Sequence, residues 1–382
     1  LTLTLTLTLT QQAACEQLRA HWDVSPRGQT MPTCTIDRCW ALLLDKIGGL
    51  QARRAAVRDF NASSKWVKRG LAAVPMRYTI AWQGAVRVAL VRIESDGKVV
   101  VEHSGIECGQ GINTVAAQVA ALELGVHVDD VLVAPTTTDG AAVPGAAGTG
   151  GSITTEQCGE VVKMASSTLA KRLAPYVAAQ PDFARAVEAA FADGVDMQAR
   201  ARFRPGKSAL GPNQYASYGA AYLEVELDVL SGVARPLDAE CVIDCGNALN
   251  PDIAGGQVQG GFVMALGYIF GGEDISFDAA SGANASAGTW EYKPPLALDT
   301  PERFNVTLLP HAPCATGFLR SKAVGEPPLL LGGCAMLALK DAVAAARAEV
   351  GADTKGFALR APAPPEALQA ACAADYGDYT LS

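Results

Sequence analysis

Histidine is scarce in this chain, and metal-binding patterns of cysteine and histidine are missing. Only four histidines occur in 382 residues, with no H-E-x-x-H motif and no C-x2-C pair. Zinc held by protein side chains uses such spacings, so the sequence argues against a zinc site. Cys34 and Cys39 have the C-x4-C spacing that begins a plant-type two-iron cluster, but Leu42 stands where the next cysteine is required. An iron–sulfur cluster on this chain is therefore not expected.

Three common nucleotide and hydrolase motifs are also missing. The small-residue stretch at residues 148–151 lacks the third glycine of a G-x-G-x-x-G dinucleotide fingerprint, and no Lys-Ser or Lys-Thr follows it as in a phosphate-binding loop. No G-x-S-x-G segment occurs either. These absences argue against a dinucleotide-binding enzyme, a P-loop nucleotidase and the commonest type of serine hydrolase.

Positive charge is in deficit, and long apolar runs are lacking. The net charge is −8 with a pI near 5.1, and no stripe of lysine or arginine with interleaved aromatics appears. Nucleic acid and anionic membrane surfaces are thus not expected as partners. We find no uninterrupted apolar run of bilayer length, so no membrane association is expected. Ten cysteines in a chain without a recognisable signal peptide favour reduced thiols and a cytoplasmic location.

The chain is nonetheless rich enough in apolar residues to fold. Hydrophobic residues make up 49% of 382 residues, which can bury a large core. The first ten residues repeat Leu-Thr, so residues 1–30 are predicted to be a low-complexity leader without function. Residues 31–382 would form the functional domain, with two subdomains meeting near residues 205–220.

Hydrophobic periodicity predicts both helices and strands along this domain. Asp96 and Gly97 lie between two alternating runs, which is typical of a β-hairpin. Residues 68–70 are read as a turn after the first helix. Strands and helices are mixed without regular alternation, so we expect an α+β fold with mixed sheets and packed helices. The expected helices are 39–61, 113–124, 154–177, 184–192, 253–268 and 330–350, and the expected strands are 86–93, 99–103, 131–134, 220–229 and 239–243.

Several polar, glycine-rich loops precede the expected helices. Gly109 and Gly111 flank Gln110, so backbone N–H groups there could approach an anion, although a tight turn would use the same residues. Ser152 and Thr154 stand behind glycines at another helix start, where they could bind a cofactor or act only as caps. Gln257 begins a helix in which its amide needs either a core partner or a ligand.

One carboxylate stands out on a rigid turn. Residues 321–329 read SKAVGEPPL, so Glu326 lies between a glycine and two prolines that lead into an apolar helix. Such a carboxylate is a candidate general base, but a glutamate at a helix start is also a common cap.

This nonapeptide resembles the segment that carries the catalytic glutamate of the molybdenum hydroxylases, the xanthine dehydrogenase and aldehyde oxidase family. Four further segments resemble the family in the same order. They match its entry into the second half of the molybdopterin region and three cofactor loops. The similarity runs from about Cys39 to the C-terminal end, and the four segments are WVKRGLAAVP at 66–75, GIECGQGINT at 105–114, GSITT at 151–155 and NPDIAGGQVQG at 250–260.

The resemblance implies a second molybdopterin-binding domain with Glu326 as the base that takes a proton during hydroxylation. Tyr78 and Thr79 would lie near the substrate. Molybdenum would be held through molybdopterin, with Gln110 nearby. The residues implied in cofactor binding are Gly109, Gln110, Gly151, Ser152, Ile153, Thr154, Gln257 and Gly325.

The resemblance also implies missing parts. The family's upstream half of the molybdenum pocket, its [2Fe-2S] domains and its FAD domain have no counterpart here, so they are expected in other domains or partner chains, and a homodimer is possible. The expected substrates are aldehydes or N-heterocycles such as purines, and the isolated chain is expected to be inactive. The alternative is a non-catalytic remnant or scaffold that keeps the fold without the cofactor, because the upstream half of the pocket is missing from this chain. Cys108 and Gly150-Gly151 also depart from the family's pattern in the cofactor loops.

Overall fold

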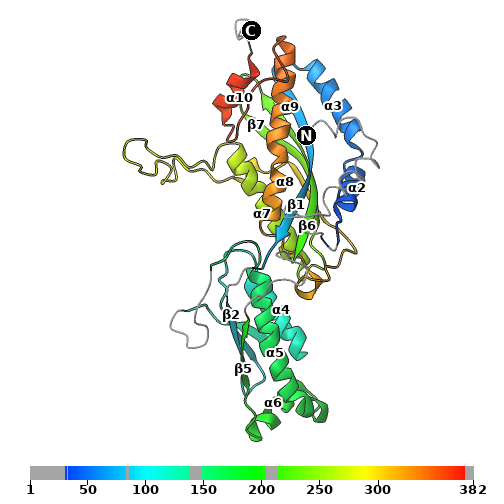
Figure 1. Ribbon diagram of the computed structural model, residues 1–382, viewed down its shortest axis with the longest axis vertical. Helices are drawn as coiled ribbons and strands as arrows, with labels where there is room; N and C mark the ends of the chain where they lie inside the picture. The colour runs from blue at the N-terminus through cyan, green and yellow to red at the C-terminus, as the bar shows by residue number, and fades with distance from the viewer. Residues whose placement is uncertain (1–30, 32, 83–85, 138–147, 204–213, 375–382) are drawn as a thin grey trace.

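The computed structural model describes residues 31, 33–82, 86–137, 148–203 and 214–374. These residues form two lobes, each built on one four-stranded sheet with helices packed against it (Figure 1). The predicted leader at residues 1–30 lies outside the described residues, as does most of the segment at which two subdomains were expected to meet.

The larger lobe contains the sheet β1-β6-β7-β8. Its strands are β1 (Val67–Ile80), β6 (Tyr215–Asp228), β7 (Ala234–Asp244) and β8 (Arg303–Leu308). β7 and β8 are parallel and the other pairs are antiparallel. The strands predicted at residues 220–229 and 239–243 are confirmed in β6 and β7, whereas the turn predicted at residues 68–70 is wrong because these residues lie inside β1.

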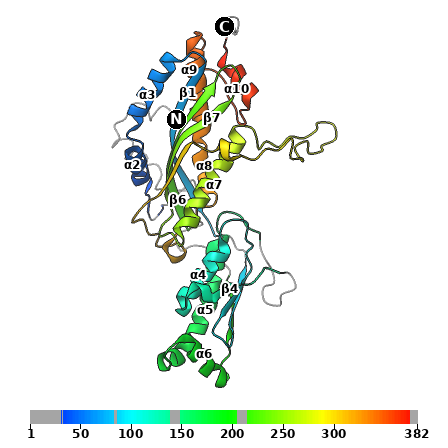
Figure 2. The ribbon, with the colours of Figure 1, turned by 180° about the vertical axis from the view of Figure 1, so that it is seen from behind.

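Helices cover both faces of this sheet (Figures 1 and 2). One face packs against α7 (Pro251–Ile269), α8 (Pro327–Gly332), α9 (Cys334–Glu349) and α10 (Pro365–Cys372), and the other against α2 (Ile36–Lys46) and α3 (Leu50–Ser63). A single helix over residues 39–61 was predicted. It is broken because Gly48 and Gly49 take φ values of 71° and 88°, which end α2 and redirect the chain.

The segment Pro327–Glu349, which forms α8 and α9, is long and apolar enough to cross a membrane by length and composition alone. Lys340 and Asp341 interrupt it, so the prediction that no uninterrupted apolar run reaches bilayer length is not contradicted. Half of this segment is buried inside the fold. Leu331, Leu339 and Val343 belong to the core against β6 and β7, and a buried core helix passes the same test of length and composition.

The smaller lobe is inserted between β1 and β6. Its sheet has the order β4-β3-β2-β5, formed by β2 (Arg87–Ile93), β3 (Val99–His103), β4 (Val131–Val133) and β5 (Gln198–Phe203). The helices α4 (Ile112–Leu124), α5 (Thr154–Ala179) and α6 (Phe183–Ala192) pack on it. The hairpin predicted around Asp96-Gly97 is confirmed as β2 and β3. With a parallel β3–β4 pair in this sheet, the expected α+β class with mixed sheets is confirmed.

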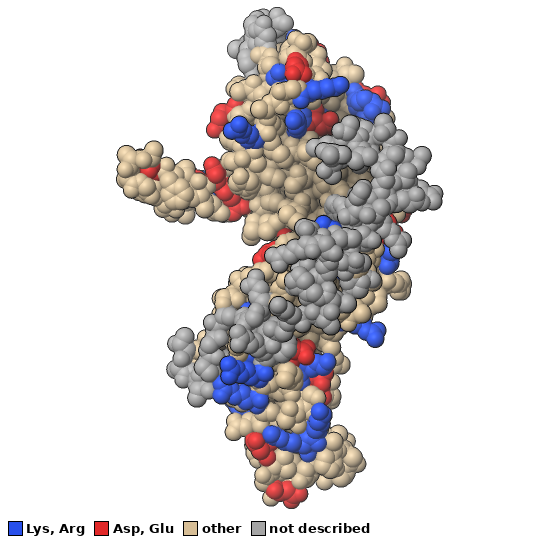
Figure 3. Space-filling model, viewed as in Figure 1, with Lys and Arg blue, Asp and Glu red and all other residues tan. Residues whose placement is uncertain are grey.

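Three short 3-10 helices complete the described elements, and a long arm projects from the larger lobe. The short helices are η2 (Val128–Asp130), η3 (Ala297–Asp299) and η4 (Phe318–Arg320). The arm follows α7, and its visible face in Figure 3 is mostly uncharged, with acidic side chains at its base and toward its tip. Its backbone is ordered by its own contacts, such as the bond from Lys293 N to Gly272 O at 2.8 Å.

Candidate functional site

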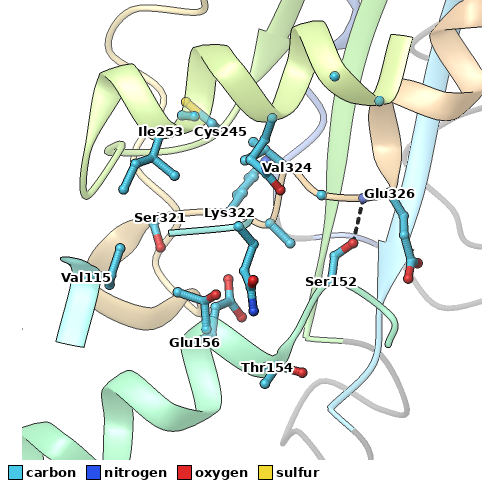
Figure 4. Close-up of a pocket in the computed structure, with 18 of the residues that line it drawn as sticks. Val115, Ser152, Thr154, Glu156, Cys245, Ile253, Ser321, Lys322, Val324 and Glu326 are labelled. Carbon is cyan, nitrogen blue, oxygen red and sulfur yellow. Dashed lines mark hydrogen bonds between the residues drawn. The ribbon is translucent and has the colours of Figure 1, made fainter. Parts of the chain in front are cut away.

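A cavity of about 450 Å³ lies where the two lobes meet. Four of the segments singled out in the sequence line it, although they are far apart along the chain. The smaller lobe supplies the loop before α4 and the loop that leads into α5. The larger lobe supplies α7 and residues 321–329 (Figure 4). Among the predicted residues, those that line the cavity are Gly109, Gln110, Ser152, Thr154, Gln257, Gly325 and Glu326.

Glu326 is held by the loop before α5. Gly151 N donates to Glu326 Oε1 at 2.8 Å, and Glu326 N donates to Ser152 Oγ at 2.6 Å (Figure 4). Ser152 reaches this position with a φ of 60°, a left-handed conformation that non-glycine residues adopt rarely. Glu326 is at the N-cap position of α8, but its side chain makes no cap hydrogen bond. The interpretation of Glu326 as a helix cap is therefore wrong.

The capping interpretation also fails for Ser152 and Thr154. Ile153 is the N-cap of α5 and no side chain caps that helix. Ser152 instead accepts from Glu326, and Thr154 Oγ1 accepts from Arg87 Nη2 at 3.3 Å. Ile153 is buried, at 4% exposure, and does not line the cavity. The loop is thus shaped by the contact of Ser152 with Glu326 of the larger lobe and of Thr154 with Arg87 of the smaller lobe, rather than by helix capping.

Tyr78, one of the two predicted substrate residues, lies against Glu326. Its hydroxyl donates to Glu326 Oε2. Burial, followed by this hydrogen bond to the carboxylate, raises the pKa of Tyr78 to about 12. Thr79 is the next residue of β1 and so faces the opposite side of the sheet, and neither Tyr78 nor Thr79 lines the cavity. The structure therefore brings Tyr78, but not Thr79, to the carboxylate.

In the loop before α4, the carboxylate of Glu107 accepts the backbone N–H groups. Glu107 Oε1 accepts from Gly109 N at 3.0 Å and from Gly111 N at 2.9 Å, and its Oε2 accepts from Asn113 N at 3.2 Å. The expectation that these N–H groups receive an external anion is therefore wrong. Gly111 is the N-cap of α4, and its position has no side-chain cap hydrogen bond.

Gln110 is likewise engaged within this loop. Its Oε1 accepts from Cys108 N at 2.7 Å and its Nε2 donates to Ile106 O at 2.8 Å. These bonds fix the shape of the loop, and they leave open space beside the backbone of Gly109, where an added Cβ would meet no atom within 4 Å. Gln257 Nε2 donates to Gly109 O at 3.2 Å, so α7 and this loop are joined across the cavity.

The lining fits a large polar organic group such as molybdopterin. A Cβ on Gly325 would stand 3.1 Å from Ser152 Oγ and 3.8 Å from Gln257 Oε1, so bare backbone lies between two polar side chains. Gly150 and Gly260 likewise have open space beside their backbone. Amides, hydroxyls and exposed peptide groups on several walls can hydrogen-bond the edges of a flat heterocycle. Within the described residues, no group of three or more His, Cys, Asp or Glu could hold a metal directly.

The sequence reasoning missed Glu156, a buried carboxyl in the cavity wall. It is 4% exposed and accepts from Trp82 Nε1 at 2.9 Å and from the hydroxyl of Tyr215. Burial raises the pKa of Glu156 to about 7, against the opposing effect of its two hydrogen bonds. In the sequence it resembles an ordinary acidic residue in the first turn of a helix, and nothing local signals its burial.

Lys322 lines the cavity, but its ammonium group is paired with the carboxylate of Asp244. Lys322 Nζ donates to Asp244 Oδ2 at 2.7 Å and to Ala216 O at 2.9 Å, and Thr35 Oγ1 donates to the same carboxylate oxygen at 2.5 Å. Lys322 and Asp244 are both buried. This ion pair fixes residues 321–326 to β6 and β7, and it supplies the lysine with an opposite charge inside the fold.

Fold and cavity together define a domain built to hold a large cofactor between two lobes. A family described as molybdopterin cofactor-binding domain matches residues 43–301. Aldehyde oxidase 2 from Cavia porcellus is 39% identical over 330 residues, which are 83% of this chain and 24% of that protein. Xanthine dehydrogenase from Oryza sativa subsp. japonica is 35% identical over 364 residues, or 90% of this chain and 26% of that protein.

Solved structures show the same fold. CO dehydrogenase from Oligotropha carboxidovorans has a TM-score of 0.74 at 21% identity, covering 94% of this chain and 49% of its own. Quinoline 2-oxidoreductase from Pseudomonas putida 86 has a TM-score of 0.73 at 24% identity, covering 91% and 47%. This chain belongs to the molybdopterin cofactor-binding domain family of the aldehyde oxidases and xanthine dehydrogenases. It spans about a quarter of the length of the curated relatives that it matches.

Proposed function

We propose that this chain supplies the catalytic carboxylate and part of the cofactor pocket of a molybdenum hydroxylase that oxidises aldehydes or N-heterocycles such as purines. The observation that carries the proposal is the position of Glu326 at the cavity wall, held by Gly151, Ser152 and Tyr78. In such a reaction a substrate C–H bond and water give a C–OH bond, two protons and two electrons. When bound, molybdenum–molybdopterin would accept the two electrons.

The chain's own residues would bind the cofactor and move one proton. Gln257, Ser152 and the peptide groups at Gly325 would hydrogen-bond its polar edges, and the open space beside Gly109 would admit it. Glu326 would accept one of the two protons, since its carboxylate lies at the cavity and its backbone is fixed. The Tyr78 hydroxyl would hold Glu326 Oε2 in place and stabilise its charged form. Preorganisation of this kind lowers the cost of placing the base beside the reacting carbon.

Further domains would complete the enzyme. The chain carries no recognisable iron–sulfur or flavin motif, so [2Fe-2S] and FAD would reside in other domains or partner subunits that receive the electrons. The isolated chain would then reduce neither NAD nor oxygen. We further propose that the assembled enzyme oxidises aromatic aldehydes at least as well as xanthine, which a comparison of kcat/KM for the two substrates would test.

A second function has support from one observation. The polar atoms of Gln110 and the N–H groups at Gly109 and Gly111 are satisfied inside their own loop. A loop whose polar groups are hydrogen-bonded within the loop itself needs no ligand to satisfy them. This is compatible with a non-catalytic remnant that binds no cofactor. The two functions differ in whether purified protein contains molybdenum and pterin.

The deciding experiment is measurement of molybdenum and pterin in the chain expressed alone and with co-purifying partners in a host that makes the cofactor. We expect both in near-equal amounts in the assembled form. Gln257→Ala should lower the content severalfold, because it removes a polar wall of the cavity. Gln259→Ala, on the exposed side of the same helix, is the matched control and should leave it unchanged. Assemblies without molybdenum or pterin would favour the remnant.

A further inference from the structure

A buried chain of hydrogen bonds joins the two lobes beneath the cavity. Ala323 N donates to the Tyr215 hydroxyl at 2.9 Å, and that hydroxyl donates to Glu156 Oε1. Trp82 Nε1 donates to Glu156 Oε2 at 2.9 Å. Glu156 belongs to the first turn of α5 in the smaller lobe, whereas Tyr215 begins β6 in the larger one.

The direction of these bonds makes Glu156 the final acceptor. The Tyr215 oxygen receives the N–H of Ala323, and its own proton goes to Glu156. Tyr215 is 1% exposed and Glu156 4%, so water does not readily replace a lost partner. Without the carboxylate, the hydroxyl proton would be buried without its acceptor, which costs about 1–3 kcal/mol for such groups. The orientation of Tyr215, and with it the anchor of Ala323, therefore depends on Glu156.

Ala323 lies three residues before Glu326 in the same short segment, and Figure 4 shows Glu156 below this segment. Gly151 and Ser152, which contact Glu326 directly, lie just before the helix that carries Glu156. The start of α5 thus holds the segment at two points, once at Glu326 and once at Ala323.

We propose that Glu156 is a positioning residue that fixes the placement of Glu326 through Tyr215 and the backbone of Ala323. The proposal rests on the proposed function only in that Glu326 is taken as the base. It assigns to Glu156 a role distinct from cofactor binding, because its two oxygens are directed to Trp82 and Tyr215. Removal of this anchor would loosen residues 321–326 and misplace the carboxylate, which lowers the rate of the proton-transfer step.

Hydrogen–deuterium exchange on the full chain, without cofactor, tests the anchor directly. In Glu156→Ala and in Tyr215→Phe we expect amides of residues 321–326 to exchange at least about tenfold faster, while amides of β7 keep wild-type rates. Glu160→Gln, one turn further along the same helix, is the control and should exchange as wild type. Trp82→Phe leaves the hydrogen bond from Tyr215 to Glu156 intact, so the amides of residues 321–326 should exchange at the wild-type rate.

Kinetics of the assembled enzyme give the second readout. Glu156→Ala and Tyr215→Phe should lower kcat by about tenfold at nearly unchanged KM and molybdenum content. Wild-type protection of residues 321–326 in both variants would overturn the proposal, as would an equal loss of protection in β7, which indicates general destabilisation. If Glu156→Ala does not fold, Tyr215→Phe decides. If residues 321–326 exchange faster in both variants while the wild-type assembly shows no turnover, the positioning role stands and the proposed function is rejected.

Discussion

Gly151 donates its backbone N–H to Glu326 Oε1 at 2.8 Å, and these two residues come from different lobes. Gly151 has a φ of 67°, which glycine adopts without strain, and this conformation directs its N–H to the carboxylate. The charge of Glu326 is thereby stabilised by a backbone donor whose position does not depend on a flexible side chain. The contact also means that Glu326 is placed only when both lobes are correctly packed.

Glu326→Gln tests the role of the carboxylate. The substitution keeps the shape and removes the proton acceptor, so turnover in the assembled enzyme should fall by about 10²-fold or more. Molybdenum content should stay near that of wild type. Steady-state kinetics and metal analysis on the same preparation measure both quantities. Unchanged turnover at equal loading would refute the assignment of Glu326 as the base, and loss of cofactor would place Glu326 in the binding shell.

Tyr78→Phe should misplace the Glu326 carboxylate without unfolding the protein. It removes the donor to Glu326 Oε2, and a hydrogen bond to a charged group in a half-buried place is worth about tenfold in kcat/KM. Since the pKa of Tyr78 is raised to about 12, its hydroxyl stays protonated and able to donate up to about pH 10. Tyr268→Phe, an exposed tyrosine, is the control. Wild-type kcat/KM in Tyr78→Phe would show that this bond has no catalytic role.

Glu156 should make stability depend on pH in a defined direction. Its pKa is about 7 in the fold and 4.5 as the ordinary value, so the folded state binds this proton more tightly than the unfolded state does. The contribution is fully present below about pH 4.5 and is lost as the pH rises through 7, a change of about 3 kcal/mol. Urea unfolding between pH 5 and 8 should show a smaller decline in Glu156→Gln than in wild type. Parallel curves would contradict the burial of this carboxyl.

Gly70→Ala should be strongly destabilising. Its new Cβ would stand 2.2 Å from Ala338 O and 2.3 Å from Ala342 N, so β1 and α9 could not keep their distance. We expect a loss of about 3 kcal/mol or more in the free energy of unfolding. Gly256→Ala on α7 meets no atom within 4 Å and should stabilise the helix by up to about 1 kcal/mol. Denaturant titration of both variants would test the close packing of β1 on α9.

The sequence predicted those parts of the fold whose signals are local. The hairpin at Asp96-Gly97 and the helices near residues 154–177 and 253–268 lie close to where they were expected, because turn residues and periodic apolar residues mark them. β1 was missed because it contains Pro75 and has Lys68 and Arg69 near its start, which weaken the pattern of a strand. Its identity as a strand comes from pairing with β6, which is distant in the sequence.

The residues of the candidate site also differ in whether a local sequence signal reveals them. Glu326 was found from its glycine and proline neighbours and from the family resemblance. Glu156 was not, because the burial that distinguishes it from a solvated glutamate arises only when β6 and α5 meet. Glu107 was missed although its partners Gly109 and Gly111 are local, because the left-handed backbone at both glycines has to be known before its carboxylate can be placed between their N–H groups.

The insertion of the smaller lobe between β1 and β6 also sets an order of folding during synthesis. β1 leaves the ribosome long before β6, the strand with which it pairs along its whole length. The smaller lobe is continuous in sequence and can form early from nearer contacts, whereas the larger sheet must wait for its partner strands and for α9. The loops before α4 and α5 therefore exist first, and Glu326 joins them later. Under the proposed function, the cofactor pocket would be complete only after residues 321–326 have packed against these loops.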